Sequence, residues 1–152
     1  MSIFTLLKDD HDSLRERITA VQRAKGQDRK IVARHYDELA LDLMVHHEAE
    51  QHVLFSHLAR LESLGDQALH AVEEHGEHRK LIEMMQDTPS FGDEWWNSFD
   101  ELAHDILHHL DEEEEDIFPL AEKNLHSKTI QELGQAYGAS KGGHKTHMQK
   151  SA

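Results

Sequence analysis

The chain has 152 residues, of which 38% are hydrophobic and 30% are charged, and its formal net charge is −14. A chain of this length can form a single domain with its own hydrophobic core. The negative charge would repel a phosphate backbone or an anionic lipid surface, so we expect neither nucleic acid nor a membrane as partner. Because the sequence has no cysteine, it can form no disulfide, thiolate metal site or cysteine nucleophile.

The N-terminal sequence MSIFTLLKDDHD has neither the basic segment nor the long apolar segment of a secretory signal. The chain also lacks a run of about 18 apolar residues, the length that a transmembrane helix needs. We therefore expect a cytoplasmic protein. Its composition is unusual in one respect, since 15 of its residues are histidine.

Apolar residues recur every three or four positions, and no alternating run typical of a strand is present, so the sequence predicts an all-α protein. Gly65 and Pro89 are expected to end two of the helices, and Pro119 should bend or end another. The four predicted helices cover approximately residues 2–24, 28–63, 66–86 and 93–122.

Short connections between four long helices favour an up-down-up-down four-helix bundle. A short fifth helix is expected over about 129–137. From Gly138 the sequence GASKGGHKTHMQKSA is polar and rich in glycine, which is typical of a flexible tail. We therefore expect a bundle domain over residues 1–137 and a flexible tail over 138–152, where His144 and His147 form only a weak metal-binding pair.

Each predicted helix carries histidine or glutamate where its core-facing stripe should be apolar. Burying one such group without a partner costs roughly 2–7 kcal/mol, so four helices that do this together need a shared compensating partner. A metal centre is such a partner. The residues concerned are His11 in the first helix, His46 and Glu50 in the second, His75 and His78 in the third, and His109 and Glu113 in the fourth.

The spacing of these residues supports a shared centre. His46 and Glu50 are four residues apart, as are His109 and Glu113, so each pair lies on one face of its helix. The chain thus reads as two helical hairpins, each with one histidine followed by a His-x-x-x-Glu pair. Four imidazoles and two carboxylates at one level suit two iron or manganese ions and leave coordination positions for solvent, O2, NO or peroxide.

Two segments carry a family resemblance. HLDEEEEDIFP at residues 109–119, and the looser HHEAEQHVLFS at residues 46–56, with Ser56 where proline is usual, resemble the repeated motif of the hemerythrin-like family of HHE cation-binding domains. His11 and His75 are similar to its two single-histidine positions, and the resemblance covers about residues 2–122. It implies a four-helix bundle with a non-haem diiron centre that binds O2 or related small molecules.

The sequence differs from the oxygen carriers that this family includes. In those carriers the third helix carries a pattern similar to His-x-x-x-His and the fourth a pattern similar to His-x-x-x-x-Asp. This chain has His75-x-x-His78 and His109-x-x-x-Glu113 instead. We expect His75 to be a ligand, and His78 to be either an extra ligand or a hydrogen-bonding neighbour. The difference favours a redox-active centre over an oxygen carrier.

Some neighbouring residues compete for these roles. His47 competes with His46, but the residue four positions after it is Gln51, a poor ligand, so we prefer His46. We expect the remaining acids in the run at 112–116 to lie mostly on a solvated face, with an inward position beside Glu113 as an alternative for Glu114 alone. We expect the surface or the surroundings of the centre for His35, His52, His57, His70, His104, His108 and His126.

Two functions follow from this reading. The first is a diiron oxidoreductase that reacts with O2, peroxide or NO in oxidative or nitrosative stress. The second is a protein without turnover, namely an oxygen carrier, a sensor or an iron store. The sequence does not decide whether the protein is an enzyme, nor its oligomeric state.

Overall fold

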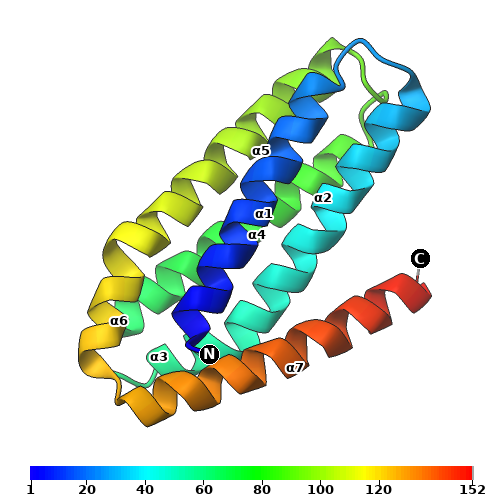
Figure 1. The fold of residues 1–152 in the computed structure, drawn as a ribbon. Coiled ribbons are helices and arrows are strands. Elements are labelled where there is room, and N and C mark those ends of the chain that lie inside the picture. Colours follow the sequence, from blue (N-terminus) through cyan, green and yellow to red (C-terminus); the bar gives the residue numbers. More distant parts are fainter. Residues whose placement is uncertain (152) are drawn as a thin grey trace.

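The computed structural model describes the backbone of residues 1–151 and the side chains of residues 1–143. In this part of the chain every regular element is helical, which confirms the predicted all-α class. Four long helical segments run alternately up and down as two hairpins, and a fifth helix lies across one end of the bundle (Figure 1). No helix within residues 1–151 is both long and apolar enough to cross a membrane.

The starts of the four long helices agree with the predicted starts to within one residue. Two of these helices continue through a π-helical turn, labelled η, into a further short helix. In chain order the elements are α1 (Ile3–Arg23), α2 (Arg29–Glu50), η1 (Gln51–Phe55), α3 (Ser56–Leu58), α4 (Gly65–Gln86), α5 (Asp93–Glu112), η2 (Glu113–Ile117), α6 (Phe118–Asn124) and α7 (Ser127–Ser151).

Local sequence accounts for the first hairpin. The Ser2 side chain accepts a hydrogen bond from the Phe4 backbone N–H at 3.1 Å and caps α1. Gly26 has a φ of +88°, a conformation that side chains disfavour, and it turns the chain after α1. Asp28 then accepts from the Lys30 N–H at 2.8 Å and starts α2. These caps fix where the two helices begin.

The two π-helical turns begin within one residue of the same place in both hairpins. η1 directly follows Glu50, and η2 starts at Glu113, so each turn comes at the end of a His-x-x-x-Glu pair. Pro119 lies in the first turn of α6, directly after η2. Proline lacks a backbone N–H and cannot continue a regular α-helix, and the change to a wider turn before it lets the helix go on to Asn124.

The fifth helix differs from the prediction. A helix over about 129–137 and a flexible tail were expected, but α7 runs without a break from Ser127 to Ser151, through the predicted boundary after residue 137. Three glycines after residue 137 lower the intrinsic helix propensity of this part of α7, which is why its sequence resembles a tail. Tyr137, which is 1% exposed, anchors the helix to the bundle. The side chains of His144 and His147 lie outside the described residues.

The core has two apolar clusters with a polar layer between them. On α1, Leu7 belongs to one cluster and Leu14 to the other, and the buried His11 lies between them. Along α5 and η2 the same change of cluster occurs between Leu110 and Ile117, on either side of the buried Glu113. The bundle therefore holds its titratable residues in a layer that apolar side chains close from both ends.

Candidate metal centre

The polar layer contains all seven residues that the sequence singled out. Each is at most 2% exposed, and one further histidine, His47, is buried with them. All four long helical segments contribute to the layer, as the sequence pattern predicted. Its members are His11, His46, His47, Glu50, His75, His78, His109 and Glu113.

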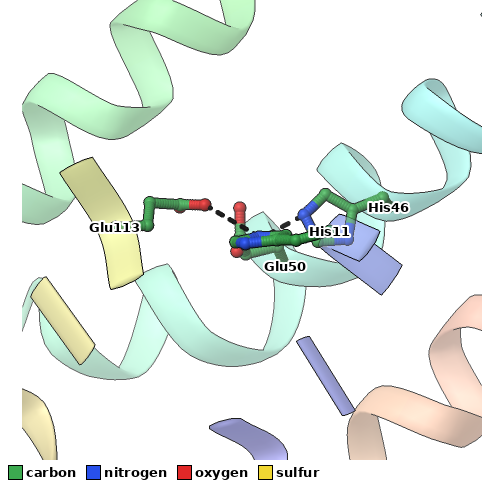
Figure 2. Close-up of side chains that lie close together, drawn as sticks. All are labelled: His11, His46, Glu50 and Glu113. Carbon is green, nitrogen blue, oxygen red and sulfur yellow. Dashed lines mark ion pairs between the residues drawn. The ribbon is translucent and has the colours of Figure 1, made fainter. Parts of the chain in front are cut away.

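One group of donor atoms comes from α1, α2 and η2. His11, His46, Glu50 and Glu113 each place one nitrogen or oxygen atom within 4.8 Å of the others. His11 Nε2 lies 3.2 Å from Glu113 Oε1, and His46 Nε2 lies 3.6 Å from Glu50 Oε2. Figure 2 shows the Glu113 side chain pointing at the His11 ring, with both ion pairs dashed. We call this set the first group.

A second group includes the same two carboxylates. Glu50 and Glu113 also meet His75 and His109, again with one atom from each residue within 4.8 Å. His75 Nε2 lies 3.2 Å from Glu50 Oε1, and His109 Nε2 lies 3.3 Å from Glu113 Oε2. The two Nε2 atoms of His75 and His109 approach to 3.0 Å. The layer therefore has two adjacent sets of donors.

The carboxylates join these two groups through different oxygens. Glu50 directs Oε2 to His46 and Oε1 to His75, while Glu113 directs Oε1 to His11 and Oε2 to His109. A carboxylate that presents one oxygen to each of two neighbouring imidazoles can bridge two metal ions. Both glutamates have this arrangement, so it relates the two groups symmetrically.

The second ring nitrogen, Nδ1, of each of these four imidazoles also has a partner. In every case it lies within hydrogen-bond distance of an oxygen that can accept, so Nδ1 carries a hydrogen, and in the neutral ring Nε2 presents its lone pair to the layer. The four contacts are His11 Nδ1 to Glu114 at 2.8 Å, His46 Nδ1 to Tyr137 at 2.9 Å, His75 Nδ1 to Gln51 at 2.8 Å and His109 Nδ1 to Glu74 at 3.0 Å.

Most of the remaining polar atoms of the layer have no hydrogen-bond partner among the described residues. Among the described side chains, Nε2 of His11 and His46 and all four carboxylate oxygens of Glu50 and Glu113 are buried without a hydrogen bond. The short nitrogen–oxygen distances between them lack hydrogen-bond geometry, as expected when lone pairs converge on a common point. Leaving such groups unpaired costs about 1–3 kcal/mol each, and more when they are charged. The donors therefore fit a pair of cations.

The charges of the two carboxylates lead to the same conclusion. Burial raises the pKa of Glu50 well above its usual value, and the negative charge of Glu113 adds to this effect. Burial would raise the pKa of Glu113 as well, but His109 and His11 outweigh it and hold this pKa well below its usual value. The protein alone thus supports one of the two negative charges, and cations would stabilise both.

The surroundings shift the pKa values of the imidazoles in opposite directions. Burial lowers the pKa of His46, and burial together with the charge of His109 lowers the pKa of His75 far below its usual value. Burial would lower the pKa of His109 too, but Glu113 and Glu74 outweigh it and raise this pKa to about 10. In the metal-free protein a proton on His109 supplies positive charge to the layer, while His46 and His75 stay neutral, as metal ligation requires.

His78 belongs to neither group, although the sequence named it as a candidate ligand. It follows His75 by three residues, and the two rings lie 6.4 Å apart. Its ring lies 5.4 Å from that of His109, and it hydrogen-bonds the backbone of Asp105. The structure therefore places His78 beside the second group as a neighbour.

His47 is the buried histidine that sequence reasoning left aside. Its ring stacks on that of His75 at 3.8 Å and lies 5.3 Å from that of His78, and neither of its nitrogens has a partner among the described residues. A signal was present, since His47 follows the buried Leu43 by four residues and so shares its helix face. The face of α2 that points inward is wide enough for both His46 and His47.

The residues around the centre were predicted only in part. Glu114, for which a solvated face was expected and an inward position was the alternative, contacts His11 and also accepts a 2.6 Å hydrogen bond from Arg15. Asp10 and Tyr137 were missed, because nothing in the sequence pattern links them to His46. Burial opposes the charge of Asp10, but hydrogen bonds with His46, Lys141 and Tyr137 hold the pKa of this carboxyl below its usual range.

One comparison with known proteins covers the segment that forms this site. The family model of the hemerythrin HHE cation binding domain matches residues 2–121, a segment that contains both His-x-x-x-Glu pairs but not α7. The chain is also 25% identical over 142 residues, 93% of its length, to a DNA nickase from Nostoc sp. (strain PCC 7120). It spans 39% of the length of that relative. No solved structure gave a significant match.

Proposed function

Because the chain belongs to the hemerythrin HHE cation-binding domain family, we propose that its polar layer binds two iron ions as a non-haem diiron centre. His11 and His46 would hold the ion at the first position, and His75 and His109 the ion at the second. Glu50 and Glu113 would bridge them. The observation that supports this most directly is that each glutamate presents one oxygen to each group.

The donor set favours iron, and manganese suits it nearly as well. Imidazole nitrogens with carboxylate oxygens are typical ligands of these metals, whereas the thiolates that favour structural zinc are missing from the sequence. Two nitrogens and two bridging oxygens at each position leave part of an octahedral shell to solvent or to a small ligand. When bound, the ions would supply Lewis acid and redox chemistry to O2, peroxide or NO.

The protein's own part in this function is to hold the donor atoms in place and to limit the access of water to the centre. The acceptors at Nδ1 keep each Nε2 lone pair directed at the centre, which reduces the reorganisation that metal binding requires. The apolar clusters above and below exclude bulk solvent from the ions. A cavity of about 210 Å³ reaches His46 from between α1 and α2, and it is large enough for a ligand of two or three atoms.

Metal content tests the proposed centre. Protein purified without a tag from iron-supplemented cells should contain about two irons per chain and show near-ultraviolet charge-transfer bands that shift on addition of azide. His109→Ala should lose much of this iron, whereas His108→Ala, its exposed neighbour, should retain it. Full iron content in His109→Ala would contradict the proposed ligands.

Reactivity then separates an enzyme from a carrier. We propose turnover, in the handling of oxidative or nitrosative stress, because the sequence lacks the oxygen-carrier spacing of ligands. The diferrous protein should be mixed with O2 and with H2O2 in a stopped-flow instrument. Rapid oxidation with repeated consumption of peroxide is the expected result. A stable and reversible spectrum with O2, without peroxide consumption, would instead assign the protein as a carrier, sensor or store.

A further inference from the structure

Helix α7 lies outside the segment that the family model matches, yet it contacts the candidate metal centre. It crosses the end of the bundle next to the N-terminus and packs on α1 and α2 (Figure 1). Among its described side chains, Tyr137 is the most deeply buried large one, at 1% exposed. The ring of Tyr137 meets that of His46 edge to face, with 6.3 Å between centroids.

The hydroxyl group of Tyr137 contacts two residues. Its O–H donates to the carboxylate of Asp10, and its oxygen accepts from His46 Nδ1 at 2.9 Å. Asp10 in turn forms an ion pair with Lys141, one helical turn after Tyr137. Because the single hydrogen of the hydroxyl is committed to Asp10, the oxygen can only accept from His46. This direction keeps the His46 Nε2 lone pair facing the first group.

Among the four imidazoles, His46 is the one whose acceptor belongs to the described part of α7. The acceptors for the other three imidazoles are Glu114, Gln51 and Glu74, all within residues 2–121, so the bundle itself supplies them. Among the described residues, the first position is therefore the one whose imidazole contacts α7. Lys141 also lines the 210 Å³ cavity that reaches His46, so α7 covers this imidazole on its outer side as well.

We propose that Tyr137 is a positioning residue for His46 that makes metal binding at the first position depend on the packing of α7 against the bundle. This inference rests on the proposed two-metal centre. Loss of the hydroxyl would leave His46 Nδ1 with the Asp10 carboxylate, 3.5 Å away, as its remaining acceptor, and this longer contact would hold the ring less firmly. An outer partner of this kind typically changes metal affinity by about 10–100-fold, so we expect that loss at the first position and little change at the second.

Tyr137→Phe tests the proposal, because it removes the hydroxyl and keeps the ring. Tyr36→Phe is the matched control, since Tyr36 is a partly buried tyrosine of the other apolar cluster, and its hydroxyl contacts Met85 rather than the centre. Each full-length protein should be titrated with Fe(II) alone, without oxygen, by calorimetry. Wild type and Tyr36→Phe should bind two ions, and Tyr137→Phe should bind one normally and one about 10–100-fold more weakly.

Hydrogen exchange of the α7 backbone supplies a readout that a merely structural role would not give. Protection of α7 should rise when Fe(II) is added to wild type and should stay unchanged in Tyr137→Phe. Lys141→Met, which removes only the ion pair with Asp10, should show a smaller effect of the same kind and serves if Tyr137→Phe does not fold.

The outcomes separate this inference from the function on which it rests. If wild type fails to bind two ions, both are overturned. If wild type binds two ions and Tyr137→Phe binds them equally well, only the inference fails. Equal weakening of both positions, together with a lower melting temperature of the metal-free variant, would also overturn it by assigning Tyr137 a general structural role.

Discussion

The buried histidines differ in what their second nitrogen does. In the four that face the carboxylates, Nδ1 donates to an oxygen and Nε2 is left for a metal ion. His47 and His78 lack this arrangement, and Nδ1 of each has no partner among the described residues. Burial of a neutral imidazole with an unpaired nitrogen should therefore affect stability even where it does not affect metal binding.

His78 should make the metal-free protein sensitive to acid. Burial, with the charge of His109, lowers its pKa to about 4, whereas an unfolded histidine titrates near 6.5. Because the unfolded state binds the proton more tightly, stability is complete above the unfolded value and is lost as the pH falls towards 4. At pH 5 this loss is about 2 kcal/mol. His78→Leu should abolish it.

Urea unfolding of the metal-free protein at pH 7.5 and pH 5 measures this effect. Between the two values the free energy of unfolding should fall by about 2 kcal/mol less in His78→Leu than in wild type. The exposed His108→Leu should behave as wild type. Identical pH dependence in all three proteins would show that His78 is not a buried neutral imidazole. Because His78 lies outside both donor groups, its replacement should also leave both metal ions bound.

The elements of the fold differ in how far local sequence determines them. Apolar periodicity and the caps at Ser2 and Asp28 are local, so the four long helices could be predicted. The inward histidines and glutamates followed, because they interrupt the same periodicity. The π-helical turns, the length of α7 and the hydrogen bonds of Tyr137 and Asp10 depend on contacts between distant segments, which a periodic pattern does not contain.

Gly134 fixes how closely α7 approaches α1. A Cβ atom at this position would overlap the Met1 carbonyl oxygen and lie 3.1 Å from the Ile3 nitrogen. Both are backbone atoms that cannot move aside easily, so Gly134→Ala should displace α7 and destabilise the protein by about 1–3 kcal/mol. The melting temperature of the metal-free protein reports this change.

A second glycine of the same helix provides the control. A Cβ at Gly138 would meet no atom within 4 Å, so Gly138→Ala should only improve helix propensity and stabilise α7 by about 0.5–1 kcal/mol. The two substitutions are chemically identical and should change the melting temperature in opposite directions. A higher melting temperature in both variants would contradict the close contact between α7 and the N-terminus.

The whole molecule combines a strong negative charge with a polar layer that is proposed to bind cations. The chain carries 30 acidic and 16 basic residues, and two divalent ions would leave it strongly acidic. The Nostoc relative is called a DNA nickase, but the match covers 39% of that protein. Any contact with DNA in the relative can therefore lie in its remaining part.

We predict that this chain, with or without iron, does not bind or nick DNA. Charge repulsion between protein and phosphate weakens with salt, whereas attraction to a basic patch is strongest at low salt. Gel-shift and supercoiled-plasmid assays at about 50 and 200 mM salt distinguish these cases. We expect no shift and no nicking at either concentration. A shift at 50 mM that disappears at 200 mM would reveal a local basic surface that outweighs the net charge. Nicking that requires iron would assign the polar layer a role in phosphodiester cleavage.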